Sequence, residues 1–240
     1  MLRCAVVLPA YQPGPILVQV VNGLLTCGFG RLIVVNDGSD VASAPIFQAI
    51  DENEQVTLLA HPDNRGKGAA LRTGLAHVWS TRQAGEMGAV TLDADGQHRP
   101  VDAVAVAHQL QRTTESLVLG VRDFHRPGVP FLRKLGNLVT CRLLAWRTGQ
   151  TLQDTQTGLR AIPMESIPDL LQIPDSGYEF ELRVLMRHRH IAQVPIETLY
   201  GDSGSHFRAI RDSLRILRVL LSPDALTCSL PRLTDRAASE

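Results

Sequence analysis

Two carboxylates that stand two residues apart, Asp93 and Asp95, follow directly on a short apolar run. If a strand over Val90–Leu92 continues through Asp95, its period of two places both side chains on one side of the backbone. Their oxygens could then share a hard divalent cation such as Mg2+ or Mn2+, which takes phosphate oxygens as further ligands. Because Asp-Gly is also a common turn pair, a simple turn at Gly96 is the alternative.

Two polar loops nearer the N-terminus also follow apolar runs. The first contains Pro9 and Tyr11, whose ring could stack on a base, although a loop stiffened by its prolines is the alternative. The second contains Asp37, whose carboxylate could accept a hydrogen bond from a base or a ribose hydroxyl. Asp37 could equally cap the helix that follows.

A third polar loop combines two glycines and two cations in Arg65-Gly66-Lys67-Gly68, at the start of a predicted helix. Unpaired backbone N–H groups and the helix dipole favour an anion at such a position. The loop is not a P-loop, because it lacks both the Gly-x-x-x-x-Gly-Lys spacing and a Ser or Thr after the lysine. Each loop alone is weak evidence, but four successive loops of this kind together favour a nucleotide or metal site.

The elements that must position these loops alternate between strand-like and helix-like patterns. Near-continuous Val, Ile and Leu runs are typical of strands covered on both faces. We expect strands at Cys4–Leu8, Leu32–Val35, Thr57–Ala60 and Val90–Leu92, and helices within Pro15–Leu25, Ala44–Asp51 and Gly68–Thr81. This order predicts an α/β fold with a mostly parallel, doubly wound sheet and helices on both faces. Ligands bind such sheets at the carboxyl ends of the strands, where the four loops lie.

The second half of the chain continues the alternation and adds a dense polar cluster at residues 153–160. We expect further elements at Leu117–Gly120 (strand), Phe131–Trp146 (helix), Tyr178–His188 (helix) and Val194–Leu199 (strand), with Pro100 opening a helix. In the polar cluster, Asp154 is a candidate for a catalytic carboxylate, and acceptance of backbone N–H groups in a turn is the alternative. Glu179, Glu181 and Arg183 predict a structural charge network.

A basic amphipathic helix is expected over residues 207–221. Its arginines and its apolar residues each recur every three or four positions. Such a helix either lies on anionic lipid or packs its apolar stripe on the domain. We expect one domain over residues 1–221 and a poorly ordered tail over residues 222–240.

Composition limits the possible partners. Lys plus Arg and Asp plus Glu both number 24, so no global field favours nucleic acid. The four cysteines form no Cys-x-x-Cys pair, which is typical of incidental thiols in a reducing cytosol. No run of about 18 apolar residues predicts a membrane span, and the first apolar run is too short for a signal peptide. We therefore expect a cytoplasmic protein whose contact with a membrane, if any, is peripheral.

The motifs Pro-x-Tyr, Asn-Asp-Gly-Ser, Asn-x-Gly-Lys-Gly and Asp-Ala-Asp-Gly-Gln-His, in this order, resemble those of the inverting GT-A glycosyltransferases of family 2. Within that family the chain is most similar, over about residues 4–220, to dolichyl- or polyprenyl-phosphate sugar synthases. The resemblance implies a GT-A fold and metal-dependent transfer of a sugar from a nucleotide-diphosphate donor. It also implies a polyprenyl-phosphate acceptor at the inner face of the cytoplasmic membrane and a role in the cell envelope.

The resemblance assigns roles to particular residues. The nucleotide sugar would contact Pro9, Tyr11, Asp37, Gly66, Lys67, Asp93, Ala94 and Asp95. The Mg2+ or Mn2+ ion would be held by Asp93, Asp95 and Gln97. The acceptor or phosphate groups would contact Arg122, Arg133, Ser205 and His206, where relatives have a Ser-Lys pair in place of Ser205 and His206. Pro13 stands where relatives usually carry a glutamate, and Asn36 replaces an aspartate, which leaves the base of the donor open.

The role of Asp154 depends on the acceptor. A sugar hydroxyl must lose its proton, so the carboxylate would act as a general base, whereas a lipid phosphate is already ionised. A non-catalytic module that binds nucleotide or lipid is the rival from another class. Nucleotidyl transfer to a sugar phosphate would require a Gly-rich basic loop after the first strand, and Pro9-Ala10-Tyr11-Gln12-Pro13 is not such a loop.

Overall fold

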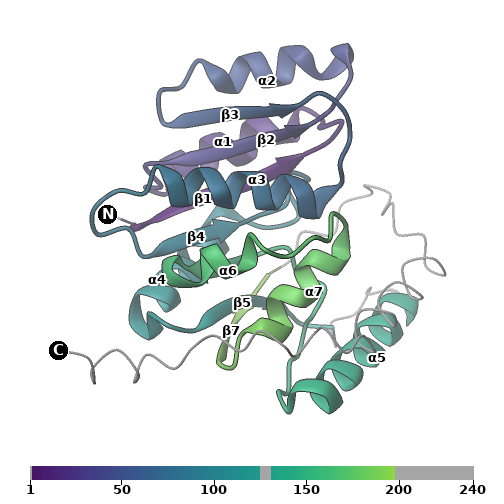
Figure 1. Ribbon diagram of the computed structural model, residues 1–240. Helices are drawn as coiled ribbons and strands as arrows, with labels where there is room; N and C mark the ends of the chain where they lie inside the picture. The colour runs from purple at the N-terminus through teal and green to yellow at the C-terminus, as the bar shows by residue number, and fades with distance from the viewer. Residues whose placement is uncertain (1, 125–130, 198–240) are drawn as a thin grey trace.

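Near the middle of the sheet lies β1 (Cys4–Ala10), flanked by parallel β2 (Leu32–Asp37) and parallel β4 (Gly88–Thr91). The structure is a computed structural model that describes residues 2–124 and 131–197, excluding the side chains of residues 131–133. Over these residues the sheet has seven strands in the order β3-β2-β1-β4-β6-β5-β7 (Figure 1). The remaining strands are β3 (Val56–His61), β5 (Leu117–Arg122), β6 (Arg160–Pro163) and β7 (Ile191–Ile196).

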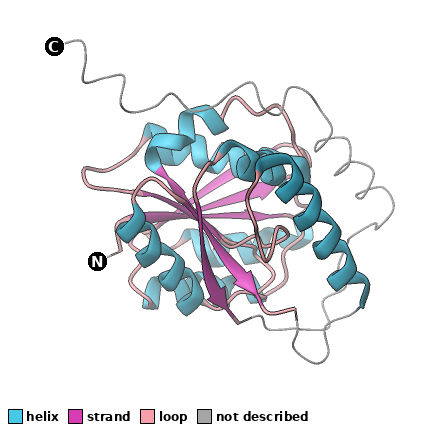
Figure 2. Cartoon of the chain, turned by 90° about the horizontal axis from the view of Figure 1, so that it is seen from below, coloured by secondary structure: helices cyan, strands magenta, loops and turns pink. Residues whose placement is uncertain are grey.

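The helices lie on both faces of this sheet (Figure 2). They are α1 (Ile16–Thr26), α2 (Ala44–Asp51), α3 (Lys67–Ser80), α4 (Pro100–Thr113), α5 (Phe131–Thr148), α6 (Ile167–Leu170) and α7 (Tyr178–Arg187), with short 3-10 turns at Val41–Ser43 and Met164–Ser166. Pro100 occupies the first turn of α4, where its missing N–H is not needed. The predicted mostly parallel sheet with helices on both faces is confirmed.

The two faces of the sheet carry separate hydrophobic cores because successive side chains of a strand point to opposite sides. On one face, Val7 packs with apolar residues of α3, α6 and α7. On the other face, Val6 and Leu8 pack with α1, α2 and α4. All three side chains have no exposed surface, so β1 is covered on both faces, as its uninterrupted apolar sequence predicts.

Strand β6 was not predicted. It runs antiparallel to both β4 and β5 and places Arg160 opposite Thr91. Its four residues begin with an arginine and end with a proline, so they lack the apolar pattern that marks the other strands. Sequence-local reasoning therefore missed the one strand that joins the two halves of the sheet in the described residues.

Two predicted boundaries also need correction. Strand β7 spans Ile191–Ile196 instead of Val194–Leu199, because it pairs in register with the whole of β5. Strand β4 ends at Thr91, so it does not continue to Asp95. The predicted helix at residues 207–221 and the predicted tail lie outside the described residues. Among the helices described, none is both long and apolar enough to span a membrane.

Candidate functional site

The loops after β1 and β2 are joined to each other at the carboxyl end of the sheet. Pro9 lies in β1, and Tyr11 follows it with 53% of its surface exposed. The backbone N–H of Gln12 donates to the Ser39 hydroxyl at 2.9 Å, and its side-chain oxygen accepts from Ser43 at 3.2 Å. The exposed Tyr11 ring is therefore carried by a fixed loop, as stacking on a base would require.

Asp37 lies at the end of β2 and is only 2% exposed. Its carboxylate accepts from the His61 ring at 2.7 Å and from the backbone N–H groups of Arg65 and Gly66 at 3.0 and 2.8 Å. Asp37 thus caps the start of α3 and not the helix that follows it in sequence, which was the alternative prediction. This carboxylate joins the second loop to the third.

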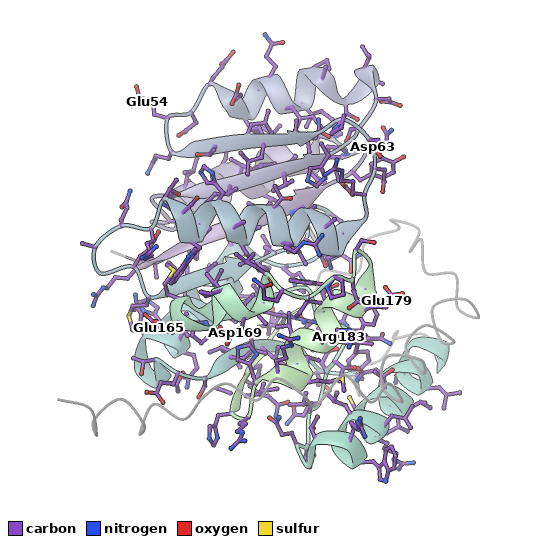
Figure 3. All side chains as sticks on the ribbon, viewed as in Figure 1. Glu54, Asp63, Glu165, Asp169, Glu179 and Arg183 are labelled. Carbon is purple, nitrogen blue, oxygen red and sulfur yellow. The ribbon has the colours of Figure 1, made fainter. Side chains whose placement is uncertain are left out.

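The third loop and the start of α7 lie at the same end of the molecule as the arrowheads of β1, β2 and β3. Figure 3 shows this with Asp63, on the loop between β3 and α3, and Glu179, in the first turn of α7. The backbone N–H of Ala69 donates to the Ser176 carbonyl at 3.1 Å, which links α3 to the segment before α7. Segments that are more than a hundred residues apart in sequence therefore meet at this edge.

Asp93 and Asp95 lie in a turn beyond β4, which we call the aspartate turn (residues 92–97). Gly96 has a φ of +74°, and the Asp95 carboxylate accepts from the Gln97 N–H at 3.0 Å. The premise of a strand through both aspartates is therefore wrong: local side-chain bonding and the glycine bend the chain instead. Asp95 is exposed, yet partial desolvation of its carboxylate and the nearby Asp93 carboxylate raise its pKa.

Lys67, the first residue of α3, joins the aspartate turn to α7. Its Nζ lies 2.7 Å from Asp93 Oδ1 and 3.1 Å from Glu181 Oε2. Burial alone would lower the pKa of Lys67, but the two carboxylates outweigh it and raise that pKa. Burial likewise opposes ionisation of Asp93, yet Lys67 holds the pKa of that carboxyl below its usual range. Both groups are therefore charged at neutral pH.

Glu181 belongs to α7 and is 3% exposed, and the buried Arg160 supports it from β6. Arg160 Nη2 lies 3.6 Å from Glu181 Oε1, and its Nη1 donates to the Glu181 carbonyl at 2.7 Å. The prediction that Glu181 and Arg183 belong to a structural charge network agrees with these ion pairs, and Arg183 is paired with Asp175. Glu181 thus faces the site, because its side chain is paired with Lys67.

A polar loop (residues 153–159) packs directly against the aspartate turn. A Cβ atom added to Gly158 would overlap the carboxylate of Asp93. The Thr91 hydroxyl donates to the Gly158 carbonyl at 2.9 Å, which fixes this approach. A side chain at position 158 would therefore require the Asp93 carboxylate to shift, so the glycine allows the two loops to lie this close together.

Asp154 lies in the polar loop with no exposed surface. Its two oxygens accept from Arg122 Nε at 2.6 Å and Nη2 at 3.0 Å, a two-pronged ion pair with the last residue of β5. The carboxylate also accepts from the Gln156 N–H at 2.9 Å, which is the turn bonding considered as an alternative. Asp154 therefore holds Arg122 and the polar loop together.

A cavity of about 840 Å³ opens beside this ion pair, between the end of β5, α5 and the end of β7. Its lining combines apolar side chains with charged ones of both signs: Phe124, Leu138 and Ile196 are apolar, Arg99, Arg122 and Lys134 are cations, and Asp102, Asp123 and Glu197 are carboxylates. Arg99 is paired with two of these carboxylates, Asp102 and Glu197. The Arg122 guanidinium carbon lies 5.1 Å from the centre of the Phe124 ring, a cation–π distance. Arg122 also acts on Asp93, whose pKa it helps to lower, so it connects the cavity to the aspartate turn.

Some predicted residues cannot be placed in this site. Arg133 lies on α5, and its side chain is outside the description. Ser205 and His206 lie outside the described residues. Ala94 is half-buried in the aspartate turn beside its two carboxylates.

The described residues contain no group of three or more His, Cys, Asp or Glu side chains arranged around one point, as a preformed metal site would be. The predicted set of Asp93, Asp95 and Gln97 nevertheless fits a hard divalent cation in its chemistry, because carboxylate and amide oxygens are the ligands that Mg2+ prefers. All three belong to the aspartate turn, in which the Asp95 carboxylate accepts from the backbone N–H of Gln97. In this structure the negative charge of Asp93 is balanced by the ammonium group of Lys67.

Comparison with known proteins is consistent with this site. The family described as glycosyl transferase family 2 matches residues 5–169. This chain belongs to glycosyltransferase family 2. A UDP-N-acetylglucosamine–dolichyl-phosphate N-acetylglucosaminyltransferase of Methanococcus voltae is 30% identical over 222 residues, covering 82% of this chain and 85% of the relative. A dolichyl-phosphate beta-glucosyltransferase of Trichomonas vaginalis is 25% identical over 205 residues, covering 79% and 61%.

Solved structures show that the fold of this glycosyltransferase is GT-A. A mycobacterial protein superposes with a TM-score of 0.67 at 21% identity, covering 91% of this chain and 73% of the other. S. aureus TarS in complex with UDP-GlcNAc superposes with a TM-score of 0.61 at 14% identity, covering 90% and 64%. The predicted family, fold and enzyme class are confirmed.

The predicted site missed Arg160, Gly158 and the role of Glu181. One signal was present for Glu181: it shares a helical stripe with Val184 and Leu185, three and four residues later, which indicates burial. A buried carboxylate requires a cation as partner. No comparable signal marks Gly158, because its constraint comes from a turn 60 and more residues away in sequence.

Proposed function

We propose that this family 2 glycosyltransferase moves a sugar from a nucleotide-diphosphate donor to a polyprenyl phosphate, with inversion at the anomeric carbon by direct displacement. The observation that carries the proposal is the position of Arg122. It lines the 840 Å³ cavity and is held by Asp154 of the polar loop, whose Gly158 lies against Asp93 in the aspartate turn. An acceptor phosphate at this guanidinium would therefore stand beside a donor diphosphate at the aspartate turn.

The donor would lie along the carboxyl edge of β1, β2 and β4. Tyr11 offers an exposed ring for the base. Asp37 and Gly66 would contact the nucleotide part of the donor, and the hydrogen bond between them holds the third loop in place for this contact. Pro9 would line the donor site, and Lys67 would lie next to the diphosphate of the donor.

Asp93, Asp95 and Gln97 would hold a divalent cation in this enzyme. When bound, Mg2+ or Mn2+ supplies Lewis-acid stabilisation of the charge that builds on the departing pyrophosphate. The aspartate turn would orient the three oxygen ligands. Gly158 of the polar loop would hold Asp93 from the other side, because it lies against the Asp93 carboxylate. The family commonly uses such ions, which supports the assignment.

The cavity beside Arg122 suits a phosphate attached to a hydrocarbon chain. Arg122 and Lys134 would supply positive charge to the phosphate, whereas Arg99 is already paired with Asp102 and Glu197. Phe124 and Leu138 would supply apolar surface to the hydrocarbon chain. Arg133 of α5, together with Ser205 and His206, would complete the phosphate contacts as the family resemblance implies. The relatives named as dolichyl-phosphate sugar transferases support this class of acceptor.

Asp154 would position Arg122 in this reaction and would not remove a proton. An ionised phosphate needs no general base, and both Asp154 oxygens already accept hydrogen bonds from Arg122. A sugar-hydroxyl acceptor would reverse this assignment, because the hydroxyl proton would then need a base. The two acceptors therefore differ in how much they depend on the Asp154 charge.

A lipid acceptor requires contact with a membrane surface, which we propose at the cytoplasmic face. Helix α5 presents apolar side chains to solvent, with Leu135, Leu138 and Val139 each more than 40% exposed and Trp146 72% exposed. Its residues 131–148 include arginines and a lysine but no acidic residue. This composition is typical of helices that lie on anionic lipid. The predicted helix 207–221 would add a second basic surface.

The donor proposal can be tested by thermal unfolding of the purified chain with UDP, GDP, dTDP or CDP, each with and without Mn2+. A ligand that binds only the folded state raises the melting temperature. At a ligand concentration of a hundred times its Kd, it adds about 2.7 kcal/mol to the free energy of unfolding. We expect a metal-dependent rise with one of the nucleotides. No rise with any of them, together with no slow hydrolysis of donor sugars in Mn2+, would favour a non-catalytic module.

A further inference from the structure

One ammonium group balances two carboxylates at the proposed metal site. Lys67 Nζ lies 2.7 Å from Asp93 Oδ1 and 3.1 Å from Glu181 Oε2. Asp93 belongs to the aspartate turn and Glu181 to α7, so the lysine joins three segments distant in sequence. The lysine and Asp93 side chains are 35% and 28% exposed, whereas that of Glu181 is 3% exposed. The open side of this bridge is therefore the Asp93 side.

We propose that Lys67 is a built-in cation that competes with the divalent ion for Asp93. In the absence of metal, it neutralises the Asp93 carboxylate. When the ion binds, Lys67 gives up Asp93 but stays paired with Glu181, and its ammonium group then faces the donor diphosphate. This inference rests on the proposed function, since it assumes the metal site formed by Asp93, Asp95 and Gln97.

Electrostatic repulsion favours such an exchange. An ammonium group at hydrogen-bond distance from Asp93 and a divalent ion on the same carboxylate would repel each other strongly at the low effective dielectric of a partly buried site. Glu181 provides Lys67 with a second carboxylate, so the lysine is not left as an uncompensated buried charge. Arg160 holds Glu181 from the other side at 3.6 Å, which keeps this second carboxylate in place.

The charge balance of the site also supports metal binding before donor binding. Lys67 and Arg160 supply two positive charges against three carboxylates, those of Asp93, Asp95 and Glu181. The site is thus negative by one charge without metal and positive by one charge with a divalent ion. A positive site attracts the diphosphate of a donor, and the released ammonium group adds a further hydrogen-bond donor for its oxygens.

The test is the affinity of the full chain for Mn2+ alone, without nucleotide, measured from the free-ion signal by electron paramagnetic resonance at one fixed pH. We expect K67M to bind Mn2+ about tenfold more tightly than wild type, because the competing charge is gone. K67R should bind no more tightly than wild type, since a guanidinium also pairs with Asp93. R65M removes a cation from the same loop and should leave the affinity unchanged, because the Arg65 side chain is 55% exposed and 3.9 Å from its partner Asp63.

A second measurement checks that K67M folds and reports the same competition. In EDTA, the melting temperature of K67M should be below that of wild type, because Asp93 and Glu181 then lack their shared cation. Mn2+ should raise the melting temperature of K67M more than that of wild type. Equal or weaker Mn2+ affinity in K67M would overturn the competition while leaving the metal site standing. No Mn2+ binding by wild type or K67M would overturn both.

Discussion

The aspartate turn and the polar loop touch each other, yet they hold their carboxylates in opposite ways. Asp95 is exposed and is oriented by the N–H of Gln97, two residues along the chain. Asp154 is fully buried and is oriented by Arg122, 32 residues away. An exposed carboxylate with local support is free to bind an ion, whereas a buried one in a two-pronged ion pair holds structure together. Under the proposed function, the same type of side chain would bind an ion on one side of Gly158 and position an arginine on the other.

The largest effect should come from Asp95→Asn. Loss of one metal ligand should lower metal-dependent sugar transfer by about a hundredfold or more. The melting temperature without metal should stay close to that of wild type, because the side chain is exposed. Steady-state rates and thermal unfolding measure the two effects. Asp63→Asn, at another exposed carboxylate near the site, is the control, and a fully active Asp95→Asn would rule out the metal assignment.

Asp154→Asn should affect stability as well as activity. Removal of its charge breaks the buried ion pair with Arg122, which should cost about 3 kcal/mol of the free energy of unfolding. Transfer to a sugar hydroxyl should fall strongly, and transfer to a lipid phosphate should fall less. Denaturant unfolding and rates on both acceptors distinguish the two roles. Unchanged stability with equal rates on every acceptor would show that Asp154 has neither role.

Gly158→Ala should disturb the contact between the two loops. The added methyl group would overlap the Asp93 carboxylate, which we expect to cost about 1–3 kcal/mol of stability and to weaken Mn2+ binding. Gly136→Ala, in α5, is the matched control, because its new methyl group would lie 3.7 Å from the nearest atom, on Gln156. That change should be neutral or stabilise the helix by up to about 1 kcal/mol. Equal melting temperatures for the two variants would contradict the close approach.

The smallest effect concerns a histidine away from both loops. Burial lowers the pKa of His188, whose Nδ1 bonds to the Val184 carbonyl at 2.7 Å. The unfolded chain therefore binds a proton more readily, so stability is present above about pH 6.5 and is lost as the pH falls below it. The loss is at most about 1.4 kcal/mol per pH unit. His188→Gln should flatten this dependence in thermal unfolding between pH 5 and 7, and an unchanged slope would contradict it.

Local sequence was sufficient for most of the elements and for the choice of the candidate metal ligands. Apolar runs predicted β1, β2 and β3, and the Asp-Ala-Asp-Gly-Gln stretch marked the metal candidates because its chemistry is contained in five neighbouring residues. What the residues alone could not predict was the bend of that stretch. A strand and a turn compete there, and the φ of +74° at Gly96 decides in favour of the turn.

The polar loop and its partners were less predictable because their roles depend on contacts over long distances in sequence. Arg160 is paired with Glu181 from α7, and Gly158 lies against Asp93 from the turn after the neighbouring strand β4. A single sequence shows an arginine and a glycine at these positions but not what lies against them. Strand β6 was missed for the same reason, since pairing with β4 and β5, and not its own pattern, makes it a strand.

The most direct measurement of the proposed activity is transfer of a labelled sugar from its nucleotide-diphosphate donor to a polyprenyl phosphate in detergent micelles. Wild type and Asp95→Asn should be compared, each with Mn2+ and with EDTA. We predict a labelled lipid product only for wild type with Mn2+. Absence of product with every donor, or equal product in EDTA, would contradict a metal-dependent polyprenyl-phosphate sugar transferase.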